Sequence, residues 1–335
     1  MRKILLLSVA VLLASLWLHL SPVHAQSTLK LANFFPPDQK IAVAMDQWCK
    51  EVEKRTNGRV KVTQFSGGTL TPPTQTYISV TRGVADIGLS FCSYTMGRFP
   101  LFEVIDLPLG YRSGYWGTKL ANEFYRKFKP KEFDDVKVLF FTTSPPHMLF
   151  AKKPIRNLDD IKGLKVRSTG TSAKVVGALG GAPVAMPMSE AYDSLSKGVA
   201  QGIICPYEAM RGFRLAEVVD NSAEYGSAYV NANYIVMNKD KWNAIAPDDQ
   251  KAMEELNNEW IEKMGKLWDD LDKDGKDYFV QRGGKVVLLP KEENERWAAK
   301  LSPILDEYVQ TMKPKNLPAE EALKFCQDYL KANQK

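Results

Sequence analysis

Histidine is scarce in this chain of 335 residues, which contains only His19, His24 and His147. Because His147 is the single histidine after residue 25, a histidine-rich metal site is excluded. A Ser-His-Asp triad could use only His147, and the GxSxG, HExxH and GxxxxGK(S/T) motifs are absent from the sequence. We therefore expect no catalytic residues, no bound metal and no cofactor.

Cysteine is also rare: Cys49, Cys92, Cys205 and Cys326 are far apart, and no CxxC motif occurs. This spacing gives no support to a zinc knuckle or a redox dithiol. Two interpretations stay open. The four thiols could form up to two disulfides in three connectivities, or they could be free and buried, which we favour because a chain this long needs no disulfide to fold.

No block of five or more charges of one sign occurs, although the net charge is +6. Lysine and arginine alternate with aspartate and glutamate along the chain, as is typical of a solvated surface, so no nucleic-acid partner is expected. Charged residues make up 25% of the chain and hydrophobic residues 44%, which is an ordinary globular composition.

The N-terminal segment has the pattern of a secretory signal. Arg2 and Lys3 precede a mostly apolar stretch over residues 4–20, and Val23-His24-Ala25 is a small-x-small cleavage site. We expect residues 1–25 to be a cleaved signal peptide and the protein to be periplasmic; the alternative is an uncleaved anchor. The remaining sequence has no run of about 18 apolar residues that could span a membrane.

Strand and helix patterns alternate in two successive sets. The first has strands at 28–34, 60–65 and 83–90 separated by helical patterns, and a second set begins with the strand at 136–143. This order predicts an α/β protein with mostly parallel sheets in two lobes. From Pro247 an apolar stripe continues to about Phe279. A coiled coil would need the same stripe, but the flanking strands favour a long helix that contacts both lobes.

Five ordered segments together resemble a known family. They are NGRVKV (57–62), GVADIG (83–88), LDDIKGLKVR (158–167), SEAYDSLSKG (189–198) and VMNKDKW (236–242). Over residues 28–335 the chain resembles the solute-binding subunits of tripartite ATP-independent periplasmic (TRAP) transporters, of the dicarboxylate-binding DctP type.

The resemblance implies a type II periplasmic binding fold, in which two α/β domains, joined by crossing strands and a long helix, close on a small organic anion. The partner is then a membrane permease driven by an ion gradient. We expect domain I at 26–148 plus about 232–277, domain II at 149–231 plus about 278–335, and a monomer.

Arg167, which ends the LKVR segment, matches the arginine that clamps the ligand's carboxylate in this family. A planar guanidinium suits this role because its fork matches two carboxylate oxygens. From the residues alone, Arg167 could equally be a surface arginine at a strand end. His147 lies where related proteins place a second polar contact, or it is a linker histidine.

The resemblance implies further ligand contacts by segment, although ordinary core packing would explain each of them as well. These candidates are Phe34, Phe35, Gln75, Phe91, Tyr94, Met188, Cys205, Tyr207, Glu208, Asn231, Asn233 and Tyr234.

Sialic-acid binders of the family carry an acidic residue near the position of Phe91 and an asparagine near Cys205. Because both positions are less polar here, we expect a monocarboxylate with an apolar or aromatic body. The alternatives are a sulfonate or dicarboxylate ligand, or a ligand-sensing role at a membrane receptor. An exported enzyme that uses Cys205 or Cys92 with His147 is the least favoured hypothesis.

Overall fold

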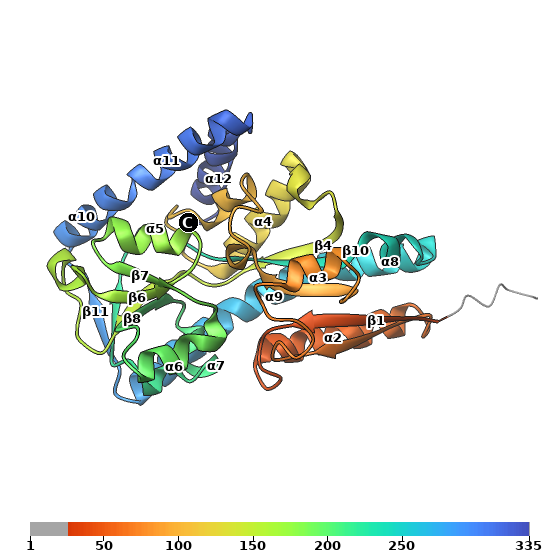
Figure 1. The fold of residues 1–335 in the computed structure, drawn as a ribbon, viewed down its shortest axis with the longest axis horizontal. Helices are drawn as coiled ribbons and strands as arrows, with labels where there is room; N and C mark the ends of the chain where they lie inside the picture. The colour runs from red at the N-terminus through yellow and green to blue at the C-terminus, as the bar shows by residue number, and fades with distance from the viewer. Residues whose placement is uncertain (1–25, 335) are drawn as a thin grey trace, which may run out of the picture.

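Two α/β lobes, each built on its own sheet, make up the computed structural model, which describes residues 26–334 (Figure 1). The type II periplasmic binding architecture expected from the sequence is confirmed. The signal peptide predicted for residues 1–25 lies outside the described residues.

The first sheet has the strand order β2-β1-β3-β10-β4. β1 pairs in parallel with β2 and β3, as the β-α-β-α-β pattern predicts. β10 is antiparallel to both of its neighbours, which departs from the expected mostly parallel sheet, because this strand enters from the second lobe and not through a crossover helix. The elements of this lobe are β1 (Ser27–Asn33), α2 (Lys40–Arg55), β2 (Val60–Phe65), α3 (Thr76–Thr81), β3 (Ile87–Phe91), α4 (Gly114–Phe128), β4 (Val136–Thr143), β10 (Ala232–Asn238) and α8 (Lys239–Asn243).

The second sheet has the order β11-β9-β5-β8-β6-β7, with β5 antiparallel to both β8 and β9. All six of its strands have four residues. The sequence predicts β6, β8 and β11 as strands at 164–167, 202–205 and 285–289, whereas β5, β7 and β9 are not predicted. The elements are β5 (Met148–Ala151), β6 (Lys165–Ser168), α5 (Thr171–Ala178), β7 (Ala182–Ala185), α6 (Ala191–Ser196), β8 (Gly202–Cys205), α7 (Glu208–Gly212), β9 (Asn221–Glu224) and β11 (Lys285–Leu288).

The long helix α9 (Pro247–Gln281) has 35 residues and contacts elements of both lobes (Figure 1). It packs on α2, α4 and β4 in the first lobe and on α7 and β11 in the second. Met253, Leu256 and Met264 of the predicted apolar stripe are buried in the first-lobe core. The helix therefore packs against both lobes, as predicted, and does not form a coiled coil.

The C-terminal helices lie along the outer edge of the molecule (Figure 1). They are α10 (Lys291–Leu301), α11 (Pro303–Met312) and α12 (Ala319–Asn333). α10 contacts α5, whereas α12 packs on α4. The C-terminal segment thus contacts elements from both parts of the chain, and the division into domains I and II given by the resemblance stays a prediction.

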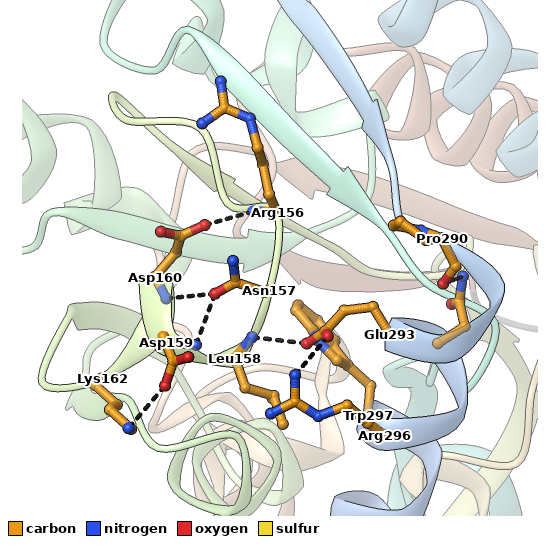
Figure 2. Close-up of polar contacts among 11 residues, drawn as sticks. Arg156, Asn157, Leu158, Asp159, Asp160, Lys162, Pro290, Glu293, Arg296 and Trp297 are labelled. Carbon is orange, nitrogen blue, oxygen red and sulfur yellow. Dashed lines mark hydrogen bonds and ion pairs between the residues drawn. The ribbon is translucent and has the colours of Figure 1, made fainter.

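Figure 2 shows how α10 is fixed to the LDDIKG segment of the second lobe. Glu293 of α10 accepts hydrogen bonds at Oε1 from the Leu158 backbone N–H at 2.8 Å and the Trp297 indole N–H at 3.2 Å. Asn157 caps the same short 3-10 turn by accepting from the N–H groups of Asp159 and Asp160. A buried carboxylate thus holds this turn, which directly precedes β6.

All four cysteines are buried and free, so the interpretation as free thiols is confirmed. Among residues 26–334, no helix combines the length and the hydropathy that a membrane span requires.

Gly275 of α9 allows the second lobe to approach the helix closely. A Cβ at this position would lie 2.2 Å from the Tyr207 carbonyl oxygen and 2.8 Å from the Glu208 Cα. We predict that Gly275→Ala lowers the free energy of unfolding by about 1–3 kcal/mol, the usual cost of overpacking, despite the higher helix propensity of alanine. Urea denaturation of the purified variant would measure the change.

Gly177 in α5 provides the matched control, because a Cβ there would meet no atom within 4 Å. Gly177→Ala should leave the urea midpoint unchanged or raise it. Equal midpoints for the two variants would contradict the close contact assigned to Gly275.

Candidate functional site

A cavity lies between the two lobes, where the predicted site residues converge. Its side chains nearly fill it, so a small molecule can enter only when side chains or lobes move apart. The lining residues come from the ends of first-lobe strands, from the two crossing segments, from the second lobe and from α9: Phe35, Phe91, Tyr94, Ser144, His147, Arg167, Met188, Pro206, Glu208, Phe213, Asn231 and Trp268.

Arg167 of β6 points into this cavity as a buried cation, with 2% of its surface exposed. Its Nε donates to the Met186 carbonyl oxygen at 3.0 Å. Among residues 26–334, no carboxylate forms an ion pair with its guanidinium, whereas most other arginines in this range have one. An unpaired buried charge costs several kcal/mol, so the site is suited to an anion.

His147 is neutral in this environment. Burial, followed by the nearby charge of Arg167, lowers the pKa of its imidazole to about 3. Nε2 lies 2.8 Å from the Ser144 Oγ, which itself accepts the Asn231 backbone N–H at 2.9 Å. The Ser144–His147 contact is compatible with either tautomer of the neutral ring, and Nδ1 lies near the Ile204 backbone without a well-formed hydrogen bond.

Aromatic rings form the first-lobe wall of the cavity. Phe35 follows β1 and Phe91 ends β3; their ring centroids are 6.1 Å apart. Tyr94 lies 5.3 Å from Phe91, and its hydroxyl accepts the Met188 backbone N–H from the second lobe at 2.9 Å. The carboxyl ends of neighbouring parallel strands meet at one edge of the sheet, which explains why segments so distant in sequence form one wall.

Six of the twelve predicted site residues line the cavity: Phe91, Tyr94, His147, Arg167, Met188 and Glu208. Phe35 and Asn231, which the sequence also suggested, line it as well.

Six predicted residues do not line the cavity. Gln75 is exposed at the start of α3, and Phe34 packs behind the wall, with its ring 4.1 Å from that of Phe35. The Tyr207 hydroxyl is turned toward Ser222 and Glu224. The remaining three, Cys205, Asn233 and Tyr234, are buried within β8 and β10.

Sequence reasoning missed Ser144, Pro206, Phe213 and Trp268. Trp268 follows Met264 by four residues and so continues the apolar stripe of α9, which is a pattern that marks burial but not a ligand site. Ser144 and Phe213 lie in short connections whose sequence carries no such signal.

Two α/β lobes around a cavity that holds a buried arginine without a counter-ion match the architecture of a solute-binding protein. A family sequence model described as bacterial extracellular solute-binding protein, family 7 (DctP), matches residues 31–311. The chain belongs to this family, and the resemblance inferred from the sequence is confirmed.

Solved structures of TRAP solute-binding proteins share the fold. One from Desulfovibrio salexigens is 32% identical, with a TM-score of 0.82 over 93% of this chain and 98% of the other. A marine metagenome protein specific for aromatic acids, in complex with metahydroxyphenylacetate, is 25% identical, with a TM-score of 0.88 over 92% and 100%. One from Rhodoferax ferrireducens, in complex with copurified benzoate, is 26% identical, with a TM-score of 0.87 over 92% and 99%.

The low pKa of His147 makes the stability of the protein depend on pH. The folded pKa of about 3 lies below the ordinary value of 6.5, so the unfolded state binds more protons between these two pH values. The stabilisation is complete above pH 6.5 and is lost as the pH falls. We predict that His147→Gln reduces the loss of stability between pH 7 and pH 5 by about 2 kcal/mol.

Urea denaturation of both proteins at each pH would measure this difference. Burial and the proximity of Asp272 raise the pKa of Glu208 to about 7, which favours folding at low pH and so opposes the His147 effect. Glu208 is present in both proteins, so its contribution cancels in the comparison. Identical pH profiles would show that His147 titrates normally in the folded protein.

Proposed function

We propose that this protein captures a small organic monocarboxylate with an apolar or aromatic body and delivers it to the membrane permease of a TRAP transporter. The main support for this proposal is that Arg167 is buried in the cavity between the lobes and forms no ion pair with any residue in 26–334. Desolvating this cation is costly, and a carboxylate that fits its planar fork offsets the cost.

The walls of the cavity support the expected type of ligand. Phe35, Phe91 and Trp268 offer ring faces to an apolar body, and the ring centroids of Phe35 and Trp268 are 5.8 Å apart. The relatives that bind benzoate and metahydroxyphenylacetate show that this fold accommodates aromatic acids. The Nδ1 of His147, which has no well-formed hydrogen bond to a described residue, can donate to a carboxylate on Arg167 when it carries the ring proton.

Binding requires the lobes to separate and close again, because the side chains nearly fill the cavity. We propose that domains I and II move as the two bodies, with the crossing strands and α9 as connections. A ligand that bridges Arg167 on one side and the aromatic wall on the other stabilises the closed form through its higher affinity for that form.

We further propose that the protein works in the periplasm as a monomer and catalyses no reaction. Burial raises the pKa of the Cys205 and Cys92 thiols well above their ordinary values, so neither provides a thiolate nucleophile. His147 has the opposite shift, and its neutral ring is already engaged by Ser144.

A substitution of Arg167 distinguishes two hypotheses: that this arginine binds the ligand, and that it only stabilises the fold. We predict that Arg167→Met weakens binding of the cognate acid by 2–5 kcal/mol, roughly 30- to 5,000-fold, which is the scale for a broken buried charge pair. The unliganded protein should keep its thermal stability, because methionine replaces an unpaired buried cation with an apolar chain of similar length. Calorimetry and thermal unfolding against a panel of carboxylates, sulfonates and sugars would measure both effects.

Arg156→Met is the control, since Arg156 is exposed. It should bind every compound as the wild type does. Acid binding by Arg167→Met within twofold of wild type would overturn the clamp, and a hit restricted to neutral sugars would overturn the monocarboxylate assignment.

Export can be tested separately from binding. If residues 1–25 are a cleaved signal peptide, protein recovered from the periplasm should have Gln26 as its N-terminal residue. N-terminal sequencing or intact mass would measure this. An intact N-terminus on membrane-bound protein would instead establish the anchor.

A further inference from the structure

Glu208 is a second buried charged group of the ligand cavity, at the start of α7. Only 5% of its surface is exposed, and no lysine or arginine among residues 26–334 forms an ion pair with it. The proposed capture of a monocarboxylate by Arg167 does not explain why the cavity also contains the acidic side chain of Glu208. A buried carboxyl in a binding cavity needs hydrogen-bond donors, so its partners decide what it can do there.

One oxygen of Glu208 is held by the first lobe. Gln39 accepts the Ile41 backbone N–H through its own Oε1, which fixes the orientation of the Gln39 amide. Its Nε2 then donates to the Oε1 of Glu208, across the two lobes. Among the described residues nothing donates to the Oε2 of Glu208, so this oxygen can accept a hydrogen bond when the carboxyl group is ionised, above its pKa of about 7.

Two neighbouring contacts fix the position of the carboxyl group. The Glu208 backbone N–H donates to the Asp272 Oδ1 of α9 at 3.0 Å. A Cβ on Gly212 would lie 2.3 Å from the Glu208 Oε1, so the carboxyl would have to shift if residue 212 carried a side chain. The backbone contact with α9 and the small residue at position 212 together allow the observed position of the carboxyl group.

Glu208 and Arg167 both line the cavity, and no ion pair joins them. Burial raises the pKa of the Cys205 thiol, Arg167 opposes this shift, and Glu208 adds to it, so the thiol lies within electrostatic reach of both groups. The pKa of Glu208, by contrast, is raised by burial and Asp272 without a contribution from Arg167. The cavity thus offers a ligand one cation and, separate from it, one carboxyl group.

We infer that Glu208 selects ligands that carry an O–H or N–H donor on the part of the body remote from their carboxylate, and that it discriminates against dicarboxylates. The inference rests on the proposed function, with the ligand carboxylate on Arg167. A hydroxyl at the remote end donates to the free oxygen of Glu208. When Glu208 is ionised, a second carboxylate brings only acceptors to that oxygen, and its desolvation is left without compensation, so the selectivity is tested at about pH 8.5.

Glu208 also lines an outer pocket with Gln39, Lys40, Arg211 and Asp274. The competing explanation is that its carboxyl serves only to join the lobes through Gln39. The two explanations predict different results for Glu208→Gln. This variant keeps an oxygen for the Gln39 donor but turns an amide N–H toward the ligand, so it retains the bond between the lobes and reverses the polarity offered to the ligand.

Calorimetry on wild type and Glu208→Gln would test the inference with benzoate, 3- and 4-hydroxybenzoate, and the matching dicarboxylates isophthalate and terephthalate. We expect wild type to bind one hydroxybenzoate at least tenfold more tightly than benzoate and than the matching dicarboxylate. In Glu208→Gln the preference for the hydroxybenzoate over the dicarboxylate should fall by about tenfold or more. Comparing the same two ligands across variants cancels their difference in size.

Gly212→Ala provides a second variant that leaves Glu208 in place but displaces its carboxyl, and it should reduce the same preference. Glu217→Gln is the matched control: Glu217 pairs with Arg214 on the outer surface, does not line the cavity, and should leave the preference unchanged.

The possible outcomes distinguish a failure of this inference from a failure of the proposed function on which it rests. If wild type binds none of these acids, the proposed function and the inference both fail. If wild type binds benzoate and the hydroxybenzoates equally well, or if Glu208→Gln weakens all acids by one common factor, only the inference fails and Glu208 serves as the bond between the lobes.

Discussion

The buried guanidinium of Arg167 is the constraint on which the arrangement of the site depends. Its charge has no counter-ion among residues 26–334, and the groups around it are kept neutral: His147 has a lowered pKa, and the Cys205 thiol has a raised one. A site of this kind is unfavourable when empty and favourable when it holds an anion. Because these neighbours are neutral, we propose the carboxylate of the ligand as the counter-ion of Arg167.

The scaffold brings distant segments to this cation with little freedom of movement. The β10 crossing segment supplies Asn231, β3 supplies Phe91, and α9 supplies Trp268 from more than thirty residues further along the chain. α9 contacts both lobes, and Gly275 allows the start of α7 to approach its backbone. The same close approach positions Glu208, so this part of the cavity depends on the one helix that both lobes share.

Much of the fold was predictable because its signals are local. The apolar stripe of α9 and the alternation in β1 and β3 are properties of short windows, and their ordered combination with the family segments is specific. Strands β5, β7 and β9 were not predicted, whereas the equally short β6, β8 and β11 were, so the length of a strand alone did not decide the outcome. The crossing strand β10 was predicted, but its antiparallel direction was not, because direction depends on where the chain re-enters a sheet, which residue patterns do not encode.

The sequence by itself determined the family and the two-lobed α/β class, because ordered motifs are sufficient for these conclusions. Through the resemblance it also suggested Arg167 and His147, both of which line the cavity, as ligand contacts. Only the tertiary structure decided that Phe35 and not Phe34 reaches the cavity, that the hydroxyl of Tyr207 points away, and that Ser144, Phe213 and Trp268 belong to it. The tertiary structure also brings the side-chain amide of Gln39 in the first lobe into a hydrogen bond with Glu208 of the second lobe. The physical reason is that a side chain's role depends on which groups surround it, and those groups come from segments far apart in sequence. Gln39 and Glu208 are separated by 169 residues, and Phe35 and Trp268 by more than 200.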